Sequence, residues 1–446
     1  MNRKGGIFVV ICFFVVMAVS RVWFVRPVAG SEFIAGKATF SGRAIGSLGS
    51  GGEKIIAAQV SLFYCQNLRD LETKIRELAV AGVNTLIVRV FQNEGDRPYQ
   101  FATARYPSGV YFQTRHAPVV GDVLGVVVRL AHRYGLKVFA WMTTRYANYG
   151  FESSMGLRGF FYDFEKGIMA PGKGFNLFRQ DVVTRLEGLY GDLAQYPIDG
   201  ILFQDDLILK HNEGFSDEAR QLFFKDHGYD PHPSLLYGET STGDGGRIVV
   251  SNYTDRFWIW ARWKNRNVLA LAQKLMNAAR TIRPDLRFAI NIFYESILEP
   301  ENAMAWYSQS LAAARDLSFD YFSIMAYHRQ MQEELNLTTI EETEDQFAHL
   351  TEKAVDMVGD PSRVLMKVQA VDWRDSRLLP VEETERFLRI VGAKPEMHVA
   401  VVPYQPDLPM GRMIRSLKRP RAYAKWALED SGMRAIHGPH PSFSPR

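Results

Sequence analysis

Apolar runs and helical patterns alternate along most of the chain. The apolar runs predict strands at 55–64, 85–91, 137–142, 200–203, 288–292, 321–325, 364–368 and 398–402. Between them, apolar residues recur three and four positions apart, which predicts helices at 68–81, 119–134, 181–196, 256–283, 303–315, 343–358 and 381–391. Strands that alternate with helices form parallel sheets, and eight such units favour an α/β fold of the closed (β/α)8 TIM barrel type.

The interval between the fourth and fifth predicted strands is longer than the other intervals. Residues 229–246 within it contain two prolines and several glycines, so we expect an insertion or a lid after strand four. The barrel is expected to span 55–430. Before it, 31–54 is rich in glycine and serine and reads as a flexible linker, and after it 431–446 reads as a loose tail.

The first 30 residues have a different pattern. Arg3 and Lys4 precede an apolar run at 7–19, and the apolar character continues to residue 25 with one interruption. A short apolar core behind a basic start is typical of a secretory signal, whereas about 20 apolar residues can span a bilayer. We therefore expect 1–30 to be a signal peptide or a signal anchor. Either places the body in the periplasm, soluble or tethered to the inner membrane.

Charge and cysteine content exclude several classes of function. The formal net charge is +4, but residues 1–30 hold four basic residues and no acidic one, so the body is balanced. A neutral body has no general field that attracts nucleic acid, and we expect no such partner. Cys65 is the body's one cysteine, and the ten histidines of the chain lack the spacing of metal ligands, so we expect no metal and no other cofactor.

The fourth predicted strand ends in Gln204, Asp205 and Asp206. In TIM barrels the reactive groups lie at the carboxyl ends of the strands. Two adjacent carboxyls ionise together only at a cost, so one of them is expected to have a raised pKa, which suits a general acid. Because side chains alternate along a strand, we expect Gln204 and Asp206 to share one face and Asp205 to take the other. A helix-capping or structural role for the pair is the alternative.

Aromatic and polar side chains that follow strands are candidates for sugar binding. Rings at this end of a barrel can stack on the apolar face of a sugar, although packing at the barrel mouth explains each ring equally well. Trp260, Trp263 and Trp306 lie within helical patterns, and core packing is expected for them. The binding candidates are Trp141, Gln204, Asn291, Tyr327, Gln369, Asp372, Trp373 and Tyr404.

Seven segments resemble, in order, the C-terminal glycoside hydrolase domain of the periplasmic poly-β-1,6-N-acetyl-D-glucosamine deacetylases. The resemblance implies an endo-acting hydrolase of partly deacetylated β-1,6-linked N-acetylglucosamine exopolysaccharide, with the acidic pair at Asp205 and Asp206. It also favours binding roles for Arg115 and His116. The segments are GVYFQTRHAP at 109–118, VFAWM at 138–142, DGILFQDD at 199–206, WARWK at 260–264, NIF at 291–293, IMA at 324–326 and QAVDW at 369–373.

The resemblance has two departures. Gln204 stands where the family has a histidine, and the family's N-terminal deacetylase domain has no counterpart in this sequence, so deacetylation is not expected. The implied partners are the polysaccharide substrate and the proteins that synthesise and export biofilm exopolysaccharide. Two rival functions stay open, a non-catalytic polysaccharide-binding barrel that guides the polymer during export and a hydrolase of a different hexosamine polymer.

A looser similarity to chitinase-like barrels concerns mechanism. Those barrels place the catalytic acid seven positions after the aspartate of an Asp-Gly pair, and Asp206 lies seven positions after Asp199. The similarity implies that Asp206 is the acid and base, that Asp205 orients the acetamido group, and that this group's oxygen is the nucleophile. The exchanged roles are the alternative. Asp163, Glu165 and Glu295 rank lower as second carboxylates.

Overall fold

The computed structural model describes residues 53–419, apart from 97–98, 103, 243–247 and 251. The predicted signal peptide or anchor at 1–30, nearly all of the predicted linker and the predicted tail at 431–446 lie outside the described residues. Among the residues that are described, no helix combines the length and the apolar character that crossing a membrane requires.

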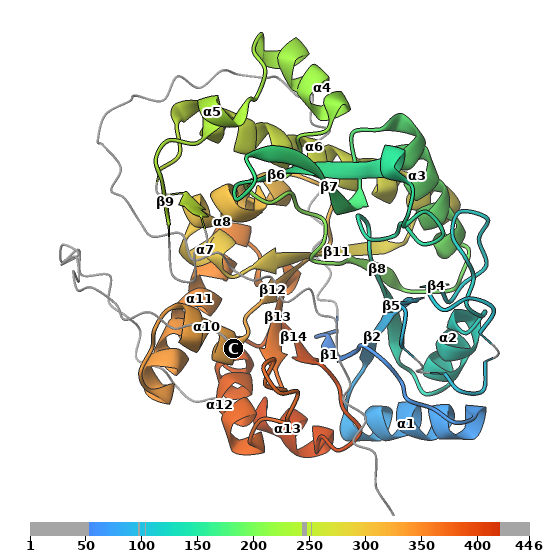
Figure 1. Cartoon of the computed structure of the whole chain (residues 1–446). Coiled ribbons are helices and arrows are strands. Elements are labelled where there is room, and N and C mark those ends of the chain that lie inside the picture. The colour runs from blue at the N-terminus through green and yellow to red at the C-terminus, as the bar shows by residue number, and fades with distance from the viewer. Residues whose placement is uncertain (1–52, 97–98, 103, 243–247, 251, 420–446) are drawn as a thin grey trace, which may run out of the picture.

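Eight parallel strands close into a barrel, which confirms the predicted (β/α)8 fold (Figure 1). Each strand pairs with the one that follows it in the barrel, and the last strand pairs with the first, where Ile56 lies opposite Val399. All eight predicted strands are present within a few residues of their expected bounds. They are β1 (Ile56–Val60), β2 (Thr85–Arg89), β5 (Lys137–Met142), β8 (Gly200–Phe203), β11 (Arg287–Phe293), β12 (Tyr321–Met325), β13 (Val364–Gln369) and β14 (His398–Val402).

Helices cover the outside of the barrel. The first of them begins at Asn67, whose side chain accepts a hydrogen bond from the backbone N–H of Asp70, and ends at Gly82 with a left-handed φ of 97°. The main helices are α1 (Leu68–Ala81), α2 (Leu124–Arg133), α3 (Gln180–Ala194), α6 (Asp255–Ile282), α11 (Ile340–Val358), α12 (Val381–Gly392) and α13 (Met410–Ser416). Shorter ones are α7 (Glu295–Leu298) and α10 (His328–Glu334).

One predicted helix is divided. The segment 303–315 was expected to be continuous, but α8 (Pro300–Tyr307) ends at Ser308, which has a left-handed φ of 50°, and α9 (Leu311–Arg315) starts after it. A residue in this conformation terminates a helix, so the single helical spacing across the segment was misleading.

The strands have two buried faces. Side chains such as Leu202, Ala289 and Ala400 point into the barrel and form an interior cluster with Trp141 and Tyr327. The alternate side chains point outward and pack beneath the helices in the main hydrophobic core. The core therefore lies between strands and helices, and the barrel lumen is filled at its base and polar higher up.

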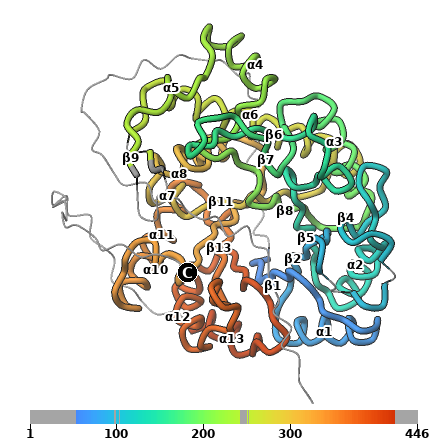
Figure 2. Tube along the Cα trace, in the orientation of Figure 1, coloured from blue at the N-terminus to red at the C-terminus, as the bar shows by residue number. Residues whose placement is uncertain are grey.

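The chain between β8 and β11 forms the predicted insertion. It consists of α4 (Asp217–His227), α5 (Pro233–Leu236), the two short strands β9 (Thr240–Thr242) and β10 (Ile248–Val250), and the first half of α6, and it lies above the barrel in Figure 2. Its own core contains Phe223, Phe257, Trp260 and Trp263. Core packing was expected for Trp260 and Trp263 and is confirmed.

Hairpins that the sequence patterns did not reveal follow the second and third barrel strands. After the third, β6 (Arg158–Asp163) and β7 (Ile168–Phe175) pair in antiparallel fashion, and Phe160 and Tyr162 pack against the core of the insertion. The shorter β3 (Phe91–Gln92) and β4 (Gly109–Val110) follow β2. The two excursions after the third and fourth barrel strands thus rest on each other, on the same side of the molecule.

Candidate active site

The acidic pair lies just beyond the end of β8. This strand ends at Phe203, and residues 205 and 206 occupy a turn. The expectation that Asp206 shares a face with Leu202 and Gln204 is wrong, because alternation holds only while the backbone stays extended. The turn sends the two carboxyls to different surroundings.

Asp206 is buried and accepts hydrogen bonds from the loop after β5, mainly at its Oδ2. The Thr143 hydroxyl donates to its Oδ2 at 2.6 Å, and the backbone N–H groups of Thr144 and Tyr146 donate at 3.0 Å. Burial raises the pKa of this carboxyl above its ordinary value, and the same hydrogen bonds and nearby Arg145 offset only part of this rise. Backbone N–H groups can only donate, so they fix Oδ2 of Asp206 as an acceptor and orient this carboxyl.

Asp205 has the opposite environment. It is half-buried, and apart from its own backbone N–H no group in the described part of the chain donates a hydrogen bond to its carboxyl. Burial raises its pKa, Asp206 raises the pKa further, and Lys367 opposes both effects. A carboxyl with a raised pKa and free oxygens can hold a proton and release it to a ligand.

Lys367 and Asn291 complete a group of three that we term the mouth cluster, Asp205, Asn291 and Lys367. Lys367 lies in the middle of β13 and is fully buried, and its Nζ donates to Asn291 Oδ1 at 2.5 Å. Burial lowers the pKa of Lys367, and Asp205 opposes this. Asn291 was predicted as a sugar ligand, but its amide oxygen is occupied by Lys367, which leaves the amide N–H groups to donate.

Aromatic rings surround the mouth cluster. Tyr327 and Trp373 meet edge to face with ring centroids 5.2 Å apart, and the Asp205 charge acts on Tyr327, whose pKa burial raises. Trp141 lies in the interior cluster, and Trp306 packs against both this cluster and the core of the insertion. The structure places Trp141, Tyr327 and Trp373 in one interior cluster together with Trp306, and their role in sugar binding stays a prediction.

Two polar atoms at the mouth lack partners among the described residues. They are the indole Nε1 of Trp141 and the amide Oε1 of Gln204, and both are buried. Buried polar atoms are rarely left without a hydrogen bond, so such atoms indicate a place where water or a ligand binds. One is a donor and the other an acceptor, which suits the hydroxyl and amide groups of a sugar.

The loop after β5 is fixed by a second group of charges, which we term the clamp, Arg145, Glu213 and Lys264. The Arg145 guanidinium donates to both carboxylate oxygens of Glu213 at 2.7 Å and to the carbonyl of Ile208 at 2.8 Å. Burial favours a protonated Glu213, but the charge and hydrogen bonds of Arg145 lower its pKa to about 2. The clamp joins the loop that holds Asp206 to the chain that follows it.

Lys264, on α6, reaches the same segment from the insertion. Its Nζ donates to the carbonyls of Lys210 at 2.6 Å and Glu213 at 3.2 Å, with a longer contact to His211 at 3.4 Å. The ammonium also lies 5.6 Å from the ring centre of Trp260. Burial lowers the pKa of Lys264 to about 7. These partners identify Lys264 as a structural cation.

Five predicted binding residues do not join the mouth cluster. His116 packs on Gly188 of α3, 4.0 Å from Asp192, and Arg115 beside it is exposed, because the loop after β4 runs along α3.

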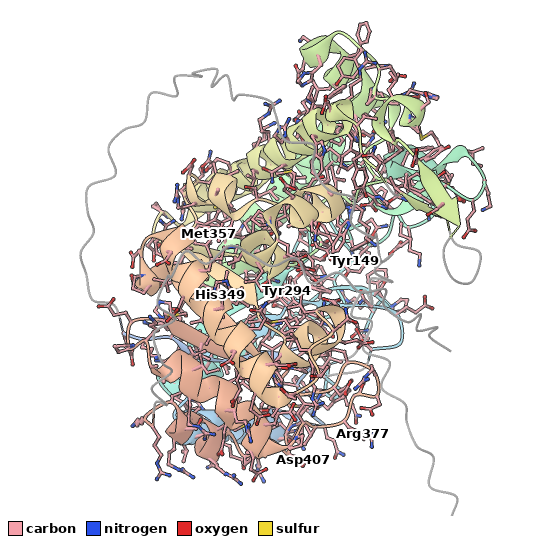
Figure 3. All side chains as sticks on the ribbon, turned by 90° about the vertical axis from the view of Figure 1, so that its left-hand side faces the viewer. Tyr149, Tyr294, His349, Met357, Arg377 and Asp407 are labelled. Atoms are coloured by element: carbon pink, nitrogen blue, oxygen red, sulfur yellow. The ribbon has the colours of Figure 1, made fainter. Side chains whose placement is uncertain are left out.

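β14 ends at Val402, and Tyr404 contacts Phe63 in the outer core. Gln369 accepts from the Arg329 N–H and donates to the Val371 carbonyl. Asp372 pairs with Arg374, and its backbone N–H donates to the carbonyl of Arg377, which lies at the lower right edge of the molecule in Figure 3.

Of the three lower-ranked carboxyls, two lie on the hairpin after β5 and the third is buried after β11. Asp163 lies on the hairpin tip, paired with Lys166, and Glu165 beside it is exposed. Glu295 follows β11 and is buried, and burial together with Glu334 raises its pKa to about 8. Its Oε1 accepts a hydrogen bond from Tyr307 at 3.3 Å, and its Oε2 has no partner within the described residues. Glu295 is therefore a neutral acid at pH 7.

Sequence reasoning missed Lys367 and Trp306 as site residues. Lys367 is the one charged residue in the apolar run of β13, where its neighbours Leu365 and Gln369 also point into the barrel, and this contrast is a usable signal. Trp306 gave no such signal, since its place depends on how α8 breaks at Ser308. In the described part of the chain, no group of three or more His, Cys, Asp and Glu side chains is arranged to hold a metal ion.

Comparison with known proteins agrees with this geometry. A family model described as hypothetical glycosyl hydrolase family 13 matches residues 65–401. No curated protein sequence is significantly similar to the chain. The PgaB (BpsB) glycoside hydrolase domain of Bordetella bronchiseptica matches in structure with a TM-score of 0.63 and 21% identity over 81% of this chain and 98% of that chain. These findings confirm the resemblance predicted from the sequence motifs.

Other solved structures share the fold. The β-amylase catalytic domain of Paenibacillus polymyxa aligns with a TM-score of 0.55 at 10% identity, covering 82% of this chain and 99% of that chain. A β-galactosidase of Rahnella sp. R3 aligns with a TM-score of 0.54 at 13% identity, covering 82% and 55%. At these identities the likeness concerns the barrel.

Proposed function

Because the chain belongs to the hypothetical glycosyl hydrolase family 13 and is a glycoside hydrolase, we propose that it cleaves partly deacetylated β-1,6-linked N-acetylglucosamine exopolysaccharide at internal bonds. Two observations support this substrate. The motifs that surround the acidic pair resemble the hydrolase domain that acts on this polymer, and the Bordetella bronchiseptica domain has the same fold over nearly its whole length. The Gln204 position, where that family has histidine, bears on which sugar units are accepted.

The observation that carries the mechanism is the contrast between the two carboxyls. Burial raises the pKa of both carboxyls, but Asp205 is half-buried and accepts a hydrogen bond only from its own backbone N–H among the described residues, whereas Asp206 accepts from three residues of the loop after β5. We therefore assign the proton donor to Asp205 and the support of the neighbouring loop to Asp206, which is the exchanged version of the roles implied by the chitinase-like spacing. Asp205 transfers its proton to the glycosidic oxygen as the bond from this oxygen to C1 breaks and the bonding electrons move to the oxygen.

We assign the nucleophile to the acetamido oxygen of the substrate. Asp206 is buried and held by the loop after β5 through three donors to its Oδ2, and burial together with Glu334 raises the pKa of Glu295 to about 8, so neither is placed as a ready nucleophile at pH 7. Attack of the acetamido oxygen on C1 gives a cyclic oxazolinium intermediate, as in other enzymes that use substrate assistance. Water then adds to C1 and returns one proton to Asp205, so that each cycle consumes one water.

The aromatic rings and the two unpartnered polar atoms provide the sugar-binding surface. Tyr327 faces Asp205 and Trp373 packs edge to face on Tyr327, so both rings can stack on a sugar, and Trp306 extends this surface toward the insertion. The Trp141 N–H and the Gln204 carbonyl can bond the polar edge of the same sugar. The sugar that receives the proton thus lies between the barrel interior and the insertion.

The test measures reducing ends released from partly deacetylated β-1,6-linked polymer. We expect Asp205→Asn to lose about 10²- to 10⁴-fold in rate, the range for removal of a general acid. On a β-1,6-linked oligomer that carries a dinitrophenyl leaving group, the same variant should keep most of its rate in the first step, because this group departs without a proton. Asp206→Asn is the matched variant, and it should lose rate equally on both substrates.

Each outcome separates the alternatives. If Asp206→Asn shows the selective loss and Asp205→Asn does not, the roles are as the chitinase-like spacing implied. If the wild type binds the polymer without releasing reducing ends, it acts on this polymer as a binding barrel. If it cleaves only a different hexosamine polymer, the assignment of the linkage is wrong while the assignment of the acid stands.

We also propose that the protein acts in the periplasm, soluble or tethered to the inner membrane, beside proteins that synthesise and export the polymer. The basic and apolar pattern of 1–30 supports this, and that segment lies outside the described residues. Cell fractionation with determination of the mature N-terminus tests it. A protein found in the cytoplasm with an intact first residue would contradict the proposal.

A further inference from the structure

A fully buried lysine lies beneath the proposed proton donor. Lys367 occupies the centre of β13, and its side chain points into the barrel between the inward residues Leu365 and Gln369. β12 separates β13 from β11, so the contact of Lys367 with Asn291 runs across the lumen. Asn291 in turn stands beside the end of β8, since Ile290 pairs with Phe203. The ammonium is thus directed toward the strand that carries Asp205.

The charges around Asp205 give this lysine a specific place. The titratable groups that face Asp205 are Asp206 next to it, Tyr146 after β5, Tyr327 after β12, and Lys367 on β13. Burial raises the pKa of both tyrosines, so they stay neutral, and Arg145 is directed to Asp206 and Glu213. Lys367 is the cation among the four facing groups.

The hydrogen bonding of Lys367 is unlike that of a structural lysine. An ammonium has three N–H donors, and within the described chain Lys367 uses one, toward Asn291 Oδ1. Lys264, equally buried, donates to three carbonyls. A buried ammonium with spare donors is costly unless it serves another group, and the nearest charge of opposite sign that still lacks a partner is that of Asp205.

We propose that Lys367 is a positioning residue of the reaction, which orients Asp205 and compensates the negative charge left on it once its proton has moved to the leaving group. This inference rests on the proposed function. During the first step the Asp205 O–H bond breaks and the carboxylate forms facing the ammonium. During the second step the proton returned from water neutralises the carboxylate, and Lys367 keeps its own protons throughout.

The pH dependence of kcat/KM for Lys367→Met tests the proposal. The descending limb of this profile reports loss of the proton from Asp205 in the free enzyme. A nearby cation favours the carboxylate, so its removal should shift this limb to higher pH by about 1 unit or more. Below the limb, the rate should fall by up to about tenfold, because a general acid that is ten times weaker transfers its proton less readily.

Lys264→Met is the control, because it removes a buried lysine at a distance from Asp205. It should leave the descending limb in place. Lys367→Gln keeps a donor for Asn291, and it serves as a second variant should the methionine variant fail to fold. If kcat/KM of the Lys367 variants falls by the same factor at every pH and the descending limb does not move, Lys367 acts only on the fold and the proposal is overturned.

A titration of carbon-13-labelled aspartate carboxyls separates this proposal from the proposed function, since it needs no substrate. Asp205→Asn identifies the resonance, and the Asp205 midpoint should rise in Lys367→Met and stay unchanged in Lys264→Met. If the midpoint rises while the polymer is not cleaved, the proposed function fails and the pairing of Lys367 with Asp205 stands. An unchanged midpoint overturns the pairing whatever the enzyme cleaves.

Discussion

The mouth cluster and the clamp each bury a lysine, and they treat it in opposite ways. In the clamp, three backbone carbonyls and the face of Trp260 surround the ammonium of Lys264. In the mouth cluster, Lys367 has Asn291 as its hydrogen-bond partner among the described residues. Burial lowers the pKa of both lysines. Equal burial therefore does not imply an equal role, and the number of partners distinguishes them.

The two adjacent aspartates repeat this contrast. Asp206 accepts hydrogen bonds from three residues of one loop, while Asp205 keeps free oxygens. Asp206 and Lys264, which have several hydrogen-bond partners, hold loops in place, and in the proposed mechanism Asp205 and Lys367, which have fewer, act on the substrate.

The largest expected effect is on the stability of the clamp. Lys264→Met leaves the carbonyls of Lys210 and Glu213 buried without their donor, and we expect a loss of about 3 to 5 kcal/mol in the free energy of unfolding. Lys367→Met, which removes a poorly partnered charge, should lose less than about half of this. Urea unfolding of both variants measures the difference. Equal losses would break the distinction between the two lysines.

Glu295 extends the comparison to a carboxyl whose Oε2 has no hydrogen-bond partner among the described residues. Its pKa is raised to about 8 from 4.5, so the folded protein holds this proton more tightly than the unfolded chain does. The resulting stability is complete below about pH 4.5 and is lost as pH rises through 8. Glu295→Gln cannot ionise, and we expect it to remove about 2 to 4 kcal/mol of the pH dependence of the free energy of unfolding.

Urea unfolding at pH 5 and at pH 8.5 measures this effect. Glu165→Gln, which changes an exposed carboxyl on the hairpin between β6 and β7, should leave the pH dependence as in the wild type. If Glu295→Gln also leaves it unchanged, Glu295 is ionised in the folded protein and could serve as the second carboxylate.

A smaller effect is expected at Asp206. Asp206→Asn places an amide N–H₂ where backbone N–H groups of Thr144 and Tyr146 now donate, and we expect a loss of about 2 kcal/mol in the free energy of unfolding. Asp205→Asn should cost almost nothing or add stability, because it relieves the repulsion from Asp206. Thermal unfolding compares the two. A larger loss for Asp205→Asn would reverse the assignment of the saturated carboxyl.

The smallest effect concerns the aromatic wall. Trp373→Ala removes one stacking surface beside Tyr327, and we expect KM for the polymer to rise about fivefold, which corresponds to about 1 kcal/mol, with little change in kcat. Phe224→Ala on α4 is the matched control, since this ring is 55% exposed and lies on the insertion. An equal change in both would show that Trp373 does not contact the substrate.

The barrel could be predicted because its signal is local. Each strand is a short apolar run between polar residues, and α1 was correct to the residue, with Asn67 and Gly82 marking its ends. Where the prediction was wrong, tertiary contacts decide the structure. The break at Ser308 divides one expected helix, and the hairpin of β6 and β7 gains its apolar partners from a segment about 50 residues later, at Phe215 and Phe223.

The sequence placed Asp205 and Asp206 at the end of β8, where the structure has them, and their role as the acidic pair stays a prediction. Alternation along the strand could not reveal the turn that gives the two carboxyls different surroundings. Motifs also drew attention to His116, whose shape fits against Gly188 of α3 rather than against a ligand. Lys367 could have been found by asking why an apolar inward position carries a charge.

The long helix α6 has a consequence for how this scaffold can vary. Its first half, with Trp260 and Trp263, forms the core of the insertion, while its second half, with Leu271 and Leu275, packs in the barrel next to α3. Shortening the insertion would expose apolar side chains in the first half of α6, and the second half of this helix packs on the barrel. Residues on the surface of this insertion can therefore change more readily than its length, which is tied to the architecture of the barrel.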